Sequence, residues 1–325
     1  MVDILIIIIF LAVLFDIANG WHDCANAIAT VVSTKVLSPG AAVTIAAVAN
    51  ILGAFMTTAV AKTMGKGIVD PTAVTDNVII AALLAAIIWN LITILMGLPV
   101  SSSHALVGGL IGAAMAHGGL GILNSGGITK IFLSLLISPV VGFIIGYGFM
   151  KSILYLFGHL TPGSISKHFG RLQIVSSTFM AFGHGSNDAQ KAMGIITMAL
   201  LSAGKIDTLD VPKWVVVMCA LAMGFGTIFG GWKIIKTLGH KMLKLEPIHG
   251  FAAETSSAAI ILVASHWGMP VSTTHVVSTA ILGVGATKRL SAVRWGIAGK
   301  IVMAWILTLP FCIAMAWGIV RLLEK

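Results

Sequence analysis

The sequence is poor in charge: only 10% of its 325 residues are Asp, Glu, Lys or Arg, whereas 58% are hydrophobic. Soluble domains carry about 25% charged residues, so this composition excludes an ordinary soluble globular protein. Cysteine is also scarce, and Cys24, Cys219 and Cys312 show neither disulfide nor metal-ligand spacing. Despite the net charge of +9, no basic, aromatic-rich stretch is present to bind nucleic acid. We therefore predict an all-α integral membrane protein with no cofactor and no nucleic-acid partner.

Long apolar runs define five segments in each half of the chain. They span about 4–34, 40–61, 77–97, 99–116 and 128–156 in the first half, and about 172–201, 214–235, 250–267, 270–286 and 295–323 in the second. A membrane span needs roughly 20 residues, so the two segments that follow a Gly-x-Pro sequence are short. Each short segment is predicted to form half of a re-entrant helical hairpin with the segment before it.

Similar sequences recur in the same order in the two halves. They are GLPVSSSH (97–104) with GMPVSTTH (268–275), KTMGK (62–66) with KTLGH (236–240), and DCANAIA (23–29) with the looser DAQKAMG (188–194). An odd number of crossings in each half inverts the second half relative to the first. We predict one transmembrane transporter domain, 1–325, with inverted repeats at about 4–156 and 172–323 and a short linker at 157–171.

Lysine and arginine residues predict the orientation of the chain in the membrane. With an outside amino terminus and alternating crossings, more of them fall on inside connections than on outside connections. Positive charge is enriched on the inside of membrane proteins. Both termini are therefore predicted to lie outside.

Five polar residues recur at helical spacing in the first apolar segment: Asp16, Asn19, Asp23, Asn26 and Thr30. This spacing places them on one helix face, which must meet protein or water because carboxylates and amides are costly in lipid. Their oxygens suit a small hard cation such as Na⁺, and a carboxylate can equally carry a proton. The alternative is a seam of hydrogen bonds between helices.

The matching stretch of the second half contains a different set of charges. His184, Asp188 and Lys191 are spaced four and three residues apart, so Asp188 and Lys191 can form a salt bridge on one helix face. Lys191 stands where the first half has Asn26. A buried lysine could attract an anion or permanently fill the place of a cation. The alternative is a charge pair that only neutralises itself.

Each Gly-x-Pro is followed by three hydroxyl residues and a histidine. The sets are Ser101, Ser102, Ser103 and His104 in the first half, and Ser272, Thr273, Thr274 and His275 in the second. A helix that begins there exposes unpaired N–H groups and its positive dipole end, which together with hydroxyls favour a tetrahedral oxyanion. The alternative is that the hydroxyls only cap the helices. The histidines could donate to the anion, carry protons or bond between helices, and Glu254 is expected to be interfacial or structural.

These motifs resemble those of the inorganic phosphate transporter (PiT) family, closest to its bacterial low-affinity branch. The resemblance is carried by NGWHDCANAIAT (19–30), GLPVSSSH (97–104), GHGSNDAQKAMGIIT (183–197) and GMPVSTTH (268–275), in family order. It implies an inverted-repeat membrane fold, homodimers in the cell (inner) membrane, and import of inorganic phosphate by symport with H⁺ or Na⁺. Some bacterial relatives are thought to carry a metal–phosphate complex.

The resemblance also implies roles for individual residues. Phosphate is expected at Ser101, Ser102, Ser103, Ser272, Thr273, Thr274 and Gln190, and the coupling cation at His22, Asp23, Asn26, Asn187 and Asp188, with Na⁺ possible at Asp23, Asn26 and Asp188. His104, His275 and Lys191 are candidate proton or anion partners. The chain has His22 where the family's signature has an asparagine, and Lys191 where the first half has an amide. Both departures weaken a full set of Na⁺ ligands, so H⁺ is slightly favoured.

Three other functions stay open from the sequence. The motifs do not distinguish phosphate from sulfate, so an oxyanion permease of another specificity is one alternative. A passive anion channel is a second. A membrane metalloenzyme is the third, with candidate ligands His22, Asp23, His104, His184 and Asp188, although these lack compact metal-site spacing.

Overall fold

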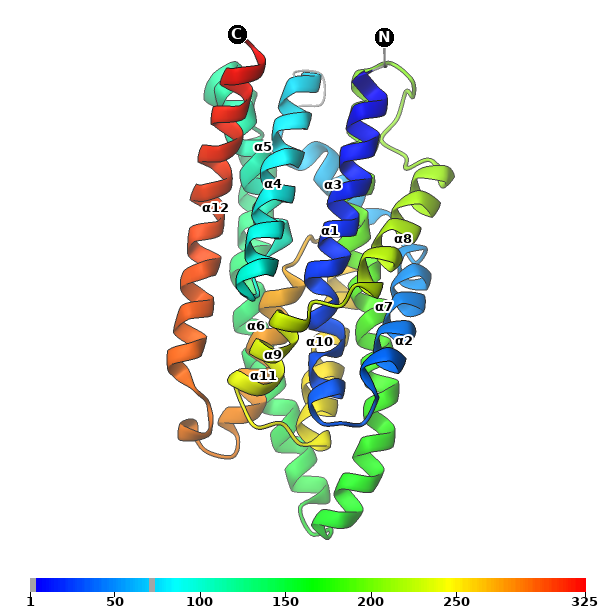
Figure 1. Ribbon diagram of the computed structural model, residues 1–325, viewed down its shortest axis with the longest axis vertical. Helices are drawn as coiled ribbons and strands as arrows, with labels where there is room; N and C mark the ends of the chain where they lie inside the picture. The colour runs from blue at the N-terminus through cyan, green and yellow to red at the C-terminus, as the bar shows by residue number, and fades with distance from the viewer. Residues whose placement is uncertain (1–3, 70–73) are drawn as a thin grey trace.

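The computed structural model describes residues 4–69 and 74–325 as helices joined by short connections (Figure 1). In the first half they are α1 (Ile4–Ser33), α2 (Pro39–Ala54), α3 (Ala59–Gly67), α4 (Asp76–Met96), α5 (Ser102–Gly118), a short 3₁₀ turn (Gly119–Ile122) and α6 (Ser125–Phe157). In the second half they are α7 (Pro162–Ser202), α8 (Lys213–Ile228), α9 (Trp232–Lys236) with a π-helical turn (Thr237–Lys241), α10 (Pro247–His266), α11 (Thr273–Ala286), a 3₁₀ turn (Leu290–Ala292) and α12 (Trp295–Leu323).

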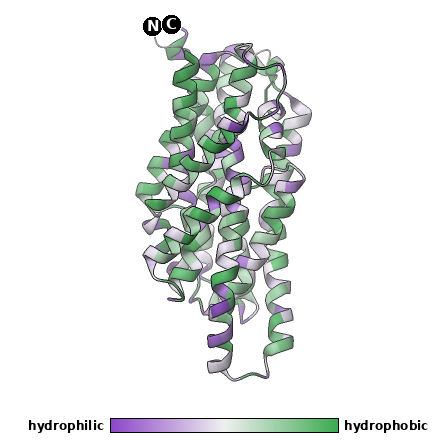
Figure 2. Cartoon of the chain, turned by 90° about the vertical axis from the view of Figure 1, so that its right-hand side faces the viewer, coloured by the Kyte–Doolittle hydropathy of each residue, from purple (hydrophilic) through white to green (hydrophobic). Residues whose placement is uncertain are grey.

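The helices form an elongated bundle made mostly of hydrophobic residues (Figure 2), and many large hydrophobic side chains are exposed on its outside. Among the described residues, 6 helices are long and apolar enough to cross a membrane, or up to 8 spans if each of two bent helix pairs counts as one. The start of α1 and the end of α12 lie at the same end of the molecule (Figure 1). The all-helical membrane class predicted from the composition is therefore confirmed.

The two halves exchange contacts in a symmetric way. Helix α1 packs on α8 of the other half, and its equivalent α7 packs on α2. In the same manner α5 packs on α12 and α11 packs on α6. Neither half therefore forms a separate bundle, and α1 and α7 contact each other at the centre.

Equivalent glycines allow these central helices to cross closely. On the α7–α2 crossing, a Cβ atom added to Gly185 would lie 2.1 Å from the Asn50 carbonyl oxygen. On the equivalent α1–α8 crossing, a Cβ at Gly20 would lie 2.4 Å from the Met223 carbonyl oxygen. Small residues at such crossings let helix backbones approach and pack in the absence of a hydrophobic driving force between helices.

The two Gly-x-Pro sequences form the turns of the predicted hairpins. Gly97 ends α4 with φ 68°, and Gly268 follows α10 with φ 66°, a left-handed backbone that favours glycine. The chain then runs extended through the proline and starts a new helix at Ser102 or Thr273. The breaks thus place the first turn of α5 and of α11 inside the bundle, where both turns are buried.

Two features of the fold add detail that the sequence-based description did not contain. The segments at 40–61 and 214–235 are not single helices, because α2 and α3 meet at a bend of 72° and α8 and α9 at a bend of 62°. The expected linker at 157–171 is mostly helical, since α7 already begins at Pro162. Thr161 caps that start and proline suits the first helical turn, a signal that the polar composition of the segment obscured.

The close helix crossings predict a large effect of one added methyl group. Gly185→Ala should lower the free energy of unfolding by about 1–3 kcal/mol, because the new Cβ must displace the α2 backbone. Gly148→Ala in α6 is the control, since its added Cβ would have no atom of another helix within 4 Å. Thermal unfolding in detergent measures both, and equal melting temperatures for the two variants would contradict the packing described here.

Candidate functional site

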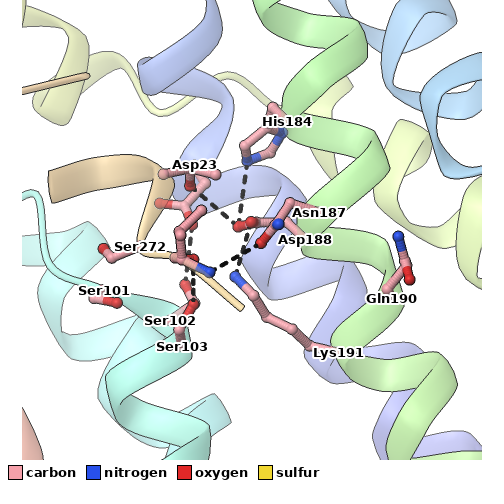
Figure 3. Close-up of polar contacts among 12 residues, drawn as sticks. Asp23, Ser101, Ser102, Ser103, His184, Asn187, Asp188, Gln190, Lys191 and Ser272 are labelled. Atoms are coloured by element: carbon pink, nitrogen blue, oxygen red, sulfur yellow. Dashed lines mark hydrogen bonds and ion pairs between the residues drawn. The ribbon is translucent and has the colours of Figure 1, made fainter. Parts of the chain in front are cut away.

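Buried polar side chains from four helices meet near the middle of the bundle (Figure 3). Asp23 comes from α1 and Asp188 from α7, and both are at most 2% exposed. The first turns of α5 and α11 contribute their hydroxyl residues, which are each 1% exposed. The inverted arrangement therefore brings together the two acidic segments and the two hydroxyl tips that the sequence predicted as one site.

Asp23 is surrounded by hydrogen-bond donors from both halves. Its Oδ1 accepts from the Thr274 hydroxyl at 3.0 Å and lies 2.8 Å from the Nδ1 atom of His22. Its Oδ2 accepts from the Ser102 hydroxyl at 3.3 Å. Asn26 joins this group by donating its amide to the Thr274 oxygen at 2.9 Å. One carboxylate thus contacts both hydroxyl tips.

Asp188 has a related but different environment. The Thr273 hydroxyl donates to its Oδ2 at 3.2 Å, as the equivalent Ser102 does to Asp23. Its Oδ1 lies 2.8 Å from the Lys191 ammonium nitrogen, and His184 Nε2 lies 3.5 Å from Oδ2. All of these side chains are at most 1% exposed. The second half therefore adds a buried cation that the first half lacks.

Hydrogen bonds fix the tautomer of His184. The Thr227 hydroxyl donates to the Met223 carbonyl at 2.9 Å, so its oxygen is left to accept from the Asn50 amide nitrogen, also at 2.9 Å. The Asn50 carbonyl oxygen is then the atom 2.9 Å from His184 Nδ1, which must carry a hydrogen. Consequently, Nε2 is the atom that faces Asp188.

Asp23, His184 and Asp188 together form a possible cation site. Each offers one ligand atom, and these atoms all lie within 4.8 Å of one another. Carboxylate oxygens suit hard cations, and a neutral imidazole suits transition metals or a proton. The sequence showed His184 at helical spacing from Asp188 but gave it a role only as a metalloenzyme ligand, and the structure places it directly beside the predicted coupling residues.

The hydroxyl tips divide into capping and inward-facing residues. Ser101 and Ser272 cap α5 and α11, since each hydroxyl oxygen accepts from the backbone N–H of the histidine three residues later at 3.2 Å. The capping alternative therefore describes this pair. Ser103 donates to the Val271 carbonyl at 3.2 Å and links the two tips. Apart from these capped histidine N–H groups, the first-turn N–H groups of both helices have no partners within their own helix.

Two of the predicted site residues, Asn187 and Gln190, make their hydrogen bonds outside the carboxylate cluster. Asn187 donates to the Ser265 hydroxyl at 3.0 Å and to the Met269 carbonyl at 3.3 Å, so it holds the hairpin turn of the second half. Gln190 accepts from the backbone N–H groups of Val60 and Ala61 at the start of α3, at 2.9 and 3.1 Å. Figure 3 shows Gln190 turned away from the carboxylate cluster. The structure does not bring its side chain to the other residues expected to bind phosphate.

The two predicted histidines of the tips stack on each other. The ring centroids of His104 and His275 are 4.7 Å apart, and His275 also stacks on Trp305 at 3.9 Å. Trp305 donates its indole N–H to the Pro99 carbonyl at 2.8 Å. The pair borders an apolar cavity of about 740 Å³ between α6 and α12. Among the described residues, both ring nitrogens of His275 and Nδ1 of His104 have no hydrogen-bond partner, so the pair stacks without the hydrogen bond between helices that was one of the alternatives.

Glu254 was expected to be interfacial or structural, and its environment is that of a structural residue: it is 2% exposed and hydrogen-bonded to the polar stripe of α1. Its carboxylate accepts from the hydroxyls of Thr30, at 2.5 Å, and Ser176, and from the Gln173 amide at 3.1 Å. The polar stripe of α1 is thus buried along its whole length, from Thr30 after Asp23 to Asp16 and Asn19 before it. A buried acid within an apolar segment was the available signal, although nothing in the sequence indicated its three donors.

Two stretches of the chain, residues 19–162 and 158–316, match the phosphate transporter family. The chain belongs to this family. It is 49% identical over 308 residues to a probable low-affinity inorganic phosphate transporter of Bacillus subtilis, covering 94% of this chain and 92% of that protein. A protein of the same description from Rhizobium meliloti is 47% identical over 309 residues, with the same coverage.

A solved structure, described as the sodium-dependent phosphate transporter, has the same fold. It aligns with a TM-score of 0.91 and 27% sequence identity over 99% of both chains. The chain is therefore a membrane phosphate transporter, which confirms the transporter class over the metalloenzyme alternative. The paired family matches agree with the two repeats. The coupling ion and the roles of individual residues are not decided by these likenesses.

The donors around Glu254 predict that its carboxylate is required for stability. Glu254→Gln should lower the free energy of unfolding by about 1–3 kcal/mol, since its NH₂ group would face a hydroxyl or amide donor. Glu324→Gln near the carboxyl terminus is the matched control, because that acid pairs with His117 at a partly exposed position. Thermal unfolding in detergent should rank the two variants, and a Glu254→Gln protein as stable as the control would show that these bonds contribute little.

Proposed function

We propose that the protein imports inorganic phosphate by symport with a cation, and that Asp23 and Asp188 bind this cation beneath the two hydroxyl tips. The main support is that one carboxylate, Asp23, accepts from hydroxyls of both tips. A cation bound to the carboxylates can replace these hydroxyls as the partner of the acid. The hydroxyls would then be free to donate to phosphate, so binding of one ligand favours binding of the other.

The tips supply the phosphate ligands in this proposal. Ser102, Ser103, Thr273 and Thr274 would donate their hydroxyls, together with the first-turn N–H groups of α5 and α11 that the caps do not use. Ser101 and Ser272 would support them as helix caps. Because the tips come from oppositely oriented halves, two positive helix ends face one anion. Movement of the halves around this shared site would give alternating access.

We favour H⁺ over Na⁺ as the coupling ion. His184 presents Nε2 to Asp188 Oδ2 at 3.5 Å, and a lone pair facing a carboxylate is repulsive unless a proton or metal ion lies between them. His22 similarly lies 2.8 Å from Asp23. Histidine exchanges protons readily near neutral pH, whereas it is a poor ligand for Na⁺. In transport of a metal–phosphate complex, Asp23, His184 and Asp188 would bind the metal ion.

We further propose that the protein works as a homodimer in the cell (inner) membrane with both termini outside. The positions of α1 and α12 support termini on the same side (Figure 1). More lysine and arginine residues fall on the connections at the end opposite the termini, which favours placing the termini outside. A passive anion channel is the competing function, and it would need no ordered cation site.

An imposed cation gradient should therefore drive phosphate uptake. In proteoliposomes, radiolabelled phosphate should accumulate above its equilibrium level under an inward H⁺ gradient, and less under an inward Na⁺ gradient. Excess sulfate should compete weakly, since sulfate cannot donate a proton to a carboxylate near neutral pH. Phosphate uptake that is the same with and without each cation gradient would instead indicate a passive channel.

Two substitutions should separate coupling from phosphate affinity. Asp23→Asn should abolish the response to a cation gradient because the amide carries no charge to bind the cation. Ser102→Ala should raise the KM for phosphate by about 10–100-fold, the effect of losing one hydrogen bond to a charged group. Ser152→Ala, an exposed serine that bonds only within α6, should leave uptake unchanged. Gradient-driven accumulation by Asp23→Asn would refute the assigned role of this acid.

A further inference from the structure

The two halves differ in charge at one pair of equivalent positions. Asp188 and Lys191 follow each other at the same spacing as Asp23 and Asn26, and both pairs lie on the central helices α7 and α1. The neighbouring hydroxyls keep the symmetry, since Ser102 donates to Asp23 and the equivalent Thr273 donates to Asp188. An amide in one half is thus replaced by an ammonium group in the other.

The first half presents oxygen atoms where the second half presents Lys191. Asn26 is 1% exposed, and its Oδ1 has no hydrogen-bond partner, while its amide nitrogen is used by Thr274. Asn26 and Asp23 both hydrogen-bond to the Thr274 hydroxyl, so amide, carboxylate and hydroxyl oxygens gather around one point, a set that suits a small cation. A buried, unpartnered oxygen beside a carboxylate is costly unless a ligand binds it.

In the second half the lysine already contacts the acid. The Lys191 Nζ atom lies 2.8 Å from Asp188 Oδ1. The Lys191 side chain is 1% exposed and is one of the largest fully buried side chains. A buried carboxylate and ammonium at this distance neutralise each other. Of the two central acids, Asp188 therefore has a fixed cation beside it, whereas Asp23 has no lysine or arginine within salt-bridge distance among the described residues.

We propose that Lys191 is a built-in cation that replaces one coupling ion, so that the protein binds one cation fewer per phosphate than a transporter with an amide at this position. The inference rests on the proposed symport and deepens it: of the two acids, Asp23 binds the ion that moves, while Asp188 is held by Lys191. The Lys191 ammonium stays on the protein while the ion at Asp23 and Asn26 moves with phosphate. Lys191 would then determine the charge carried in each cycle.

The alternative role for Lys191 is direct binding of phosphate. That role would make Lys191 substitutions raise the KM for phosphate without changing the number of cations. The ion pair at 2.8 Å argues for the fixed-cation role, because the ammonium already faces the carboxylate that a second coupling ion would occupy.

Exchanging the two residues between the halves tests the proposal. Lys191→Asn should require one more cation, so the charge moved per phosphate in proteoliposomes should rise by one positive charge. Asn26→Lys should lower it by one, and the double exchange Asn26→Lys/Lys191→Asn should restore the wild-type value. Lys191→Arg is the control and should keep that value because it preserves the fixed charge. Current and radiolabelled uptake measured together give the charge per phosphate.

A second readout does not require transport. The wild-type protein in detergent should be stabilised by its coupling ion, seen as a rise of melting temperature with Na⁺ or with H⁺ concentration. Lys191→Asn should make this dependence steeper, and Asn26→Lys should make it shallower. If Lys191→Asn kept both the wild-type charge per phosphate and the wild-type cation dependence of melting, the fixed-cation role would be overturned. A raised phosphate KM with unchanged charge would indicate direct phosphate binding instead.

The proposed function can fail separately. Wild-type protein that takes up phosphate without any cation gradient effect would refute the symport. The cation dependence of melting in Lys191→Asn and Asn26→Lys would still show whether Lys191 fills a cation position.

Discussion

Two carboxylates buried at membrane depth, Asp23 and Asp188, are the constraint around which the rest of the bundle is arranged. A buried charge is costly unless it is paired and hydrogen-bonded. Each acid therefore accepts from a hydroxyl of its own half, Ser102 or Thr273, and has a histidine beside it. Those hydroxyls reach the centre only because both hairpins break inside the bundle at Gly97 and Gly268. The acids and the helix breaks thus depend on each other.

The inverted repeat explains how one short motif can build both sides of a site. Close crossings at Gly20 and Gly185 hold α1 and α7 against helices of the opposite half. Two helix N-termini then approach one point from opposite directions, which a single copy of the motif could not achieve. The symmetry ends at Asn26 and Lys191, where one half offers an oxygen and the other a positive charge. That difference gives the two acids different partners and, in our account, different duties.

The sequence predicted much of this arrangement because its strongest signals are local. The polar stripe of α1 and the duplicated hydroxyl motif could be located by helical spacing and by comparison of the halves. Gln190 shows the limit of such reasoning: it lies in the right motif, yet its side chain caps α3, whose helix start has no sequence signal near 190. The roles of Asn50, Glu254 and Ser176 were equally hidden, because their partners lie far away in the chain. Glycine crossings were also missed, since a glycine in an apolar segment does not reveal which backbone it meets.

Flux coupling in the reverse sense tests the central claim most directly. If cation and phosphate bind and move together, a phosphate gradient must drive the cation, as much as the cation drives phosphate. Proteoliposomes with equal pH on both sides, a pH-sensitive dye inside and phosphate added outside provide this measurement. The account predicts that the interior becomes more acidic as phosphate enters. This acidification should exceed the acidification that phosphate ionisation causes in protein-free liposomes loaded to the same level. The excess should be lost in Asp23→Asn. Phosphate entry without any accompanying movement of H⁺ or Na⁺ would contradict it.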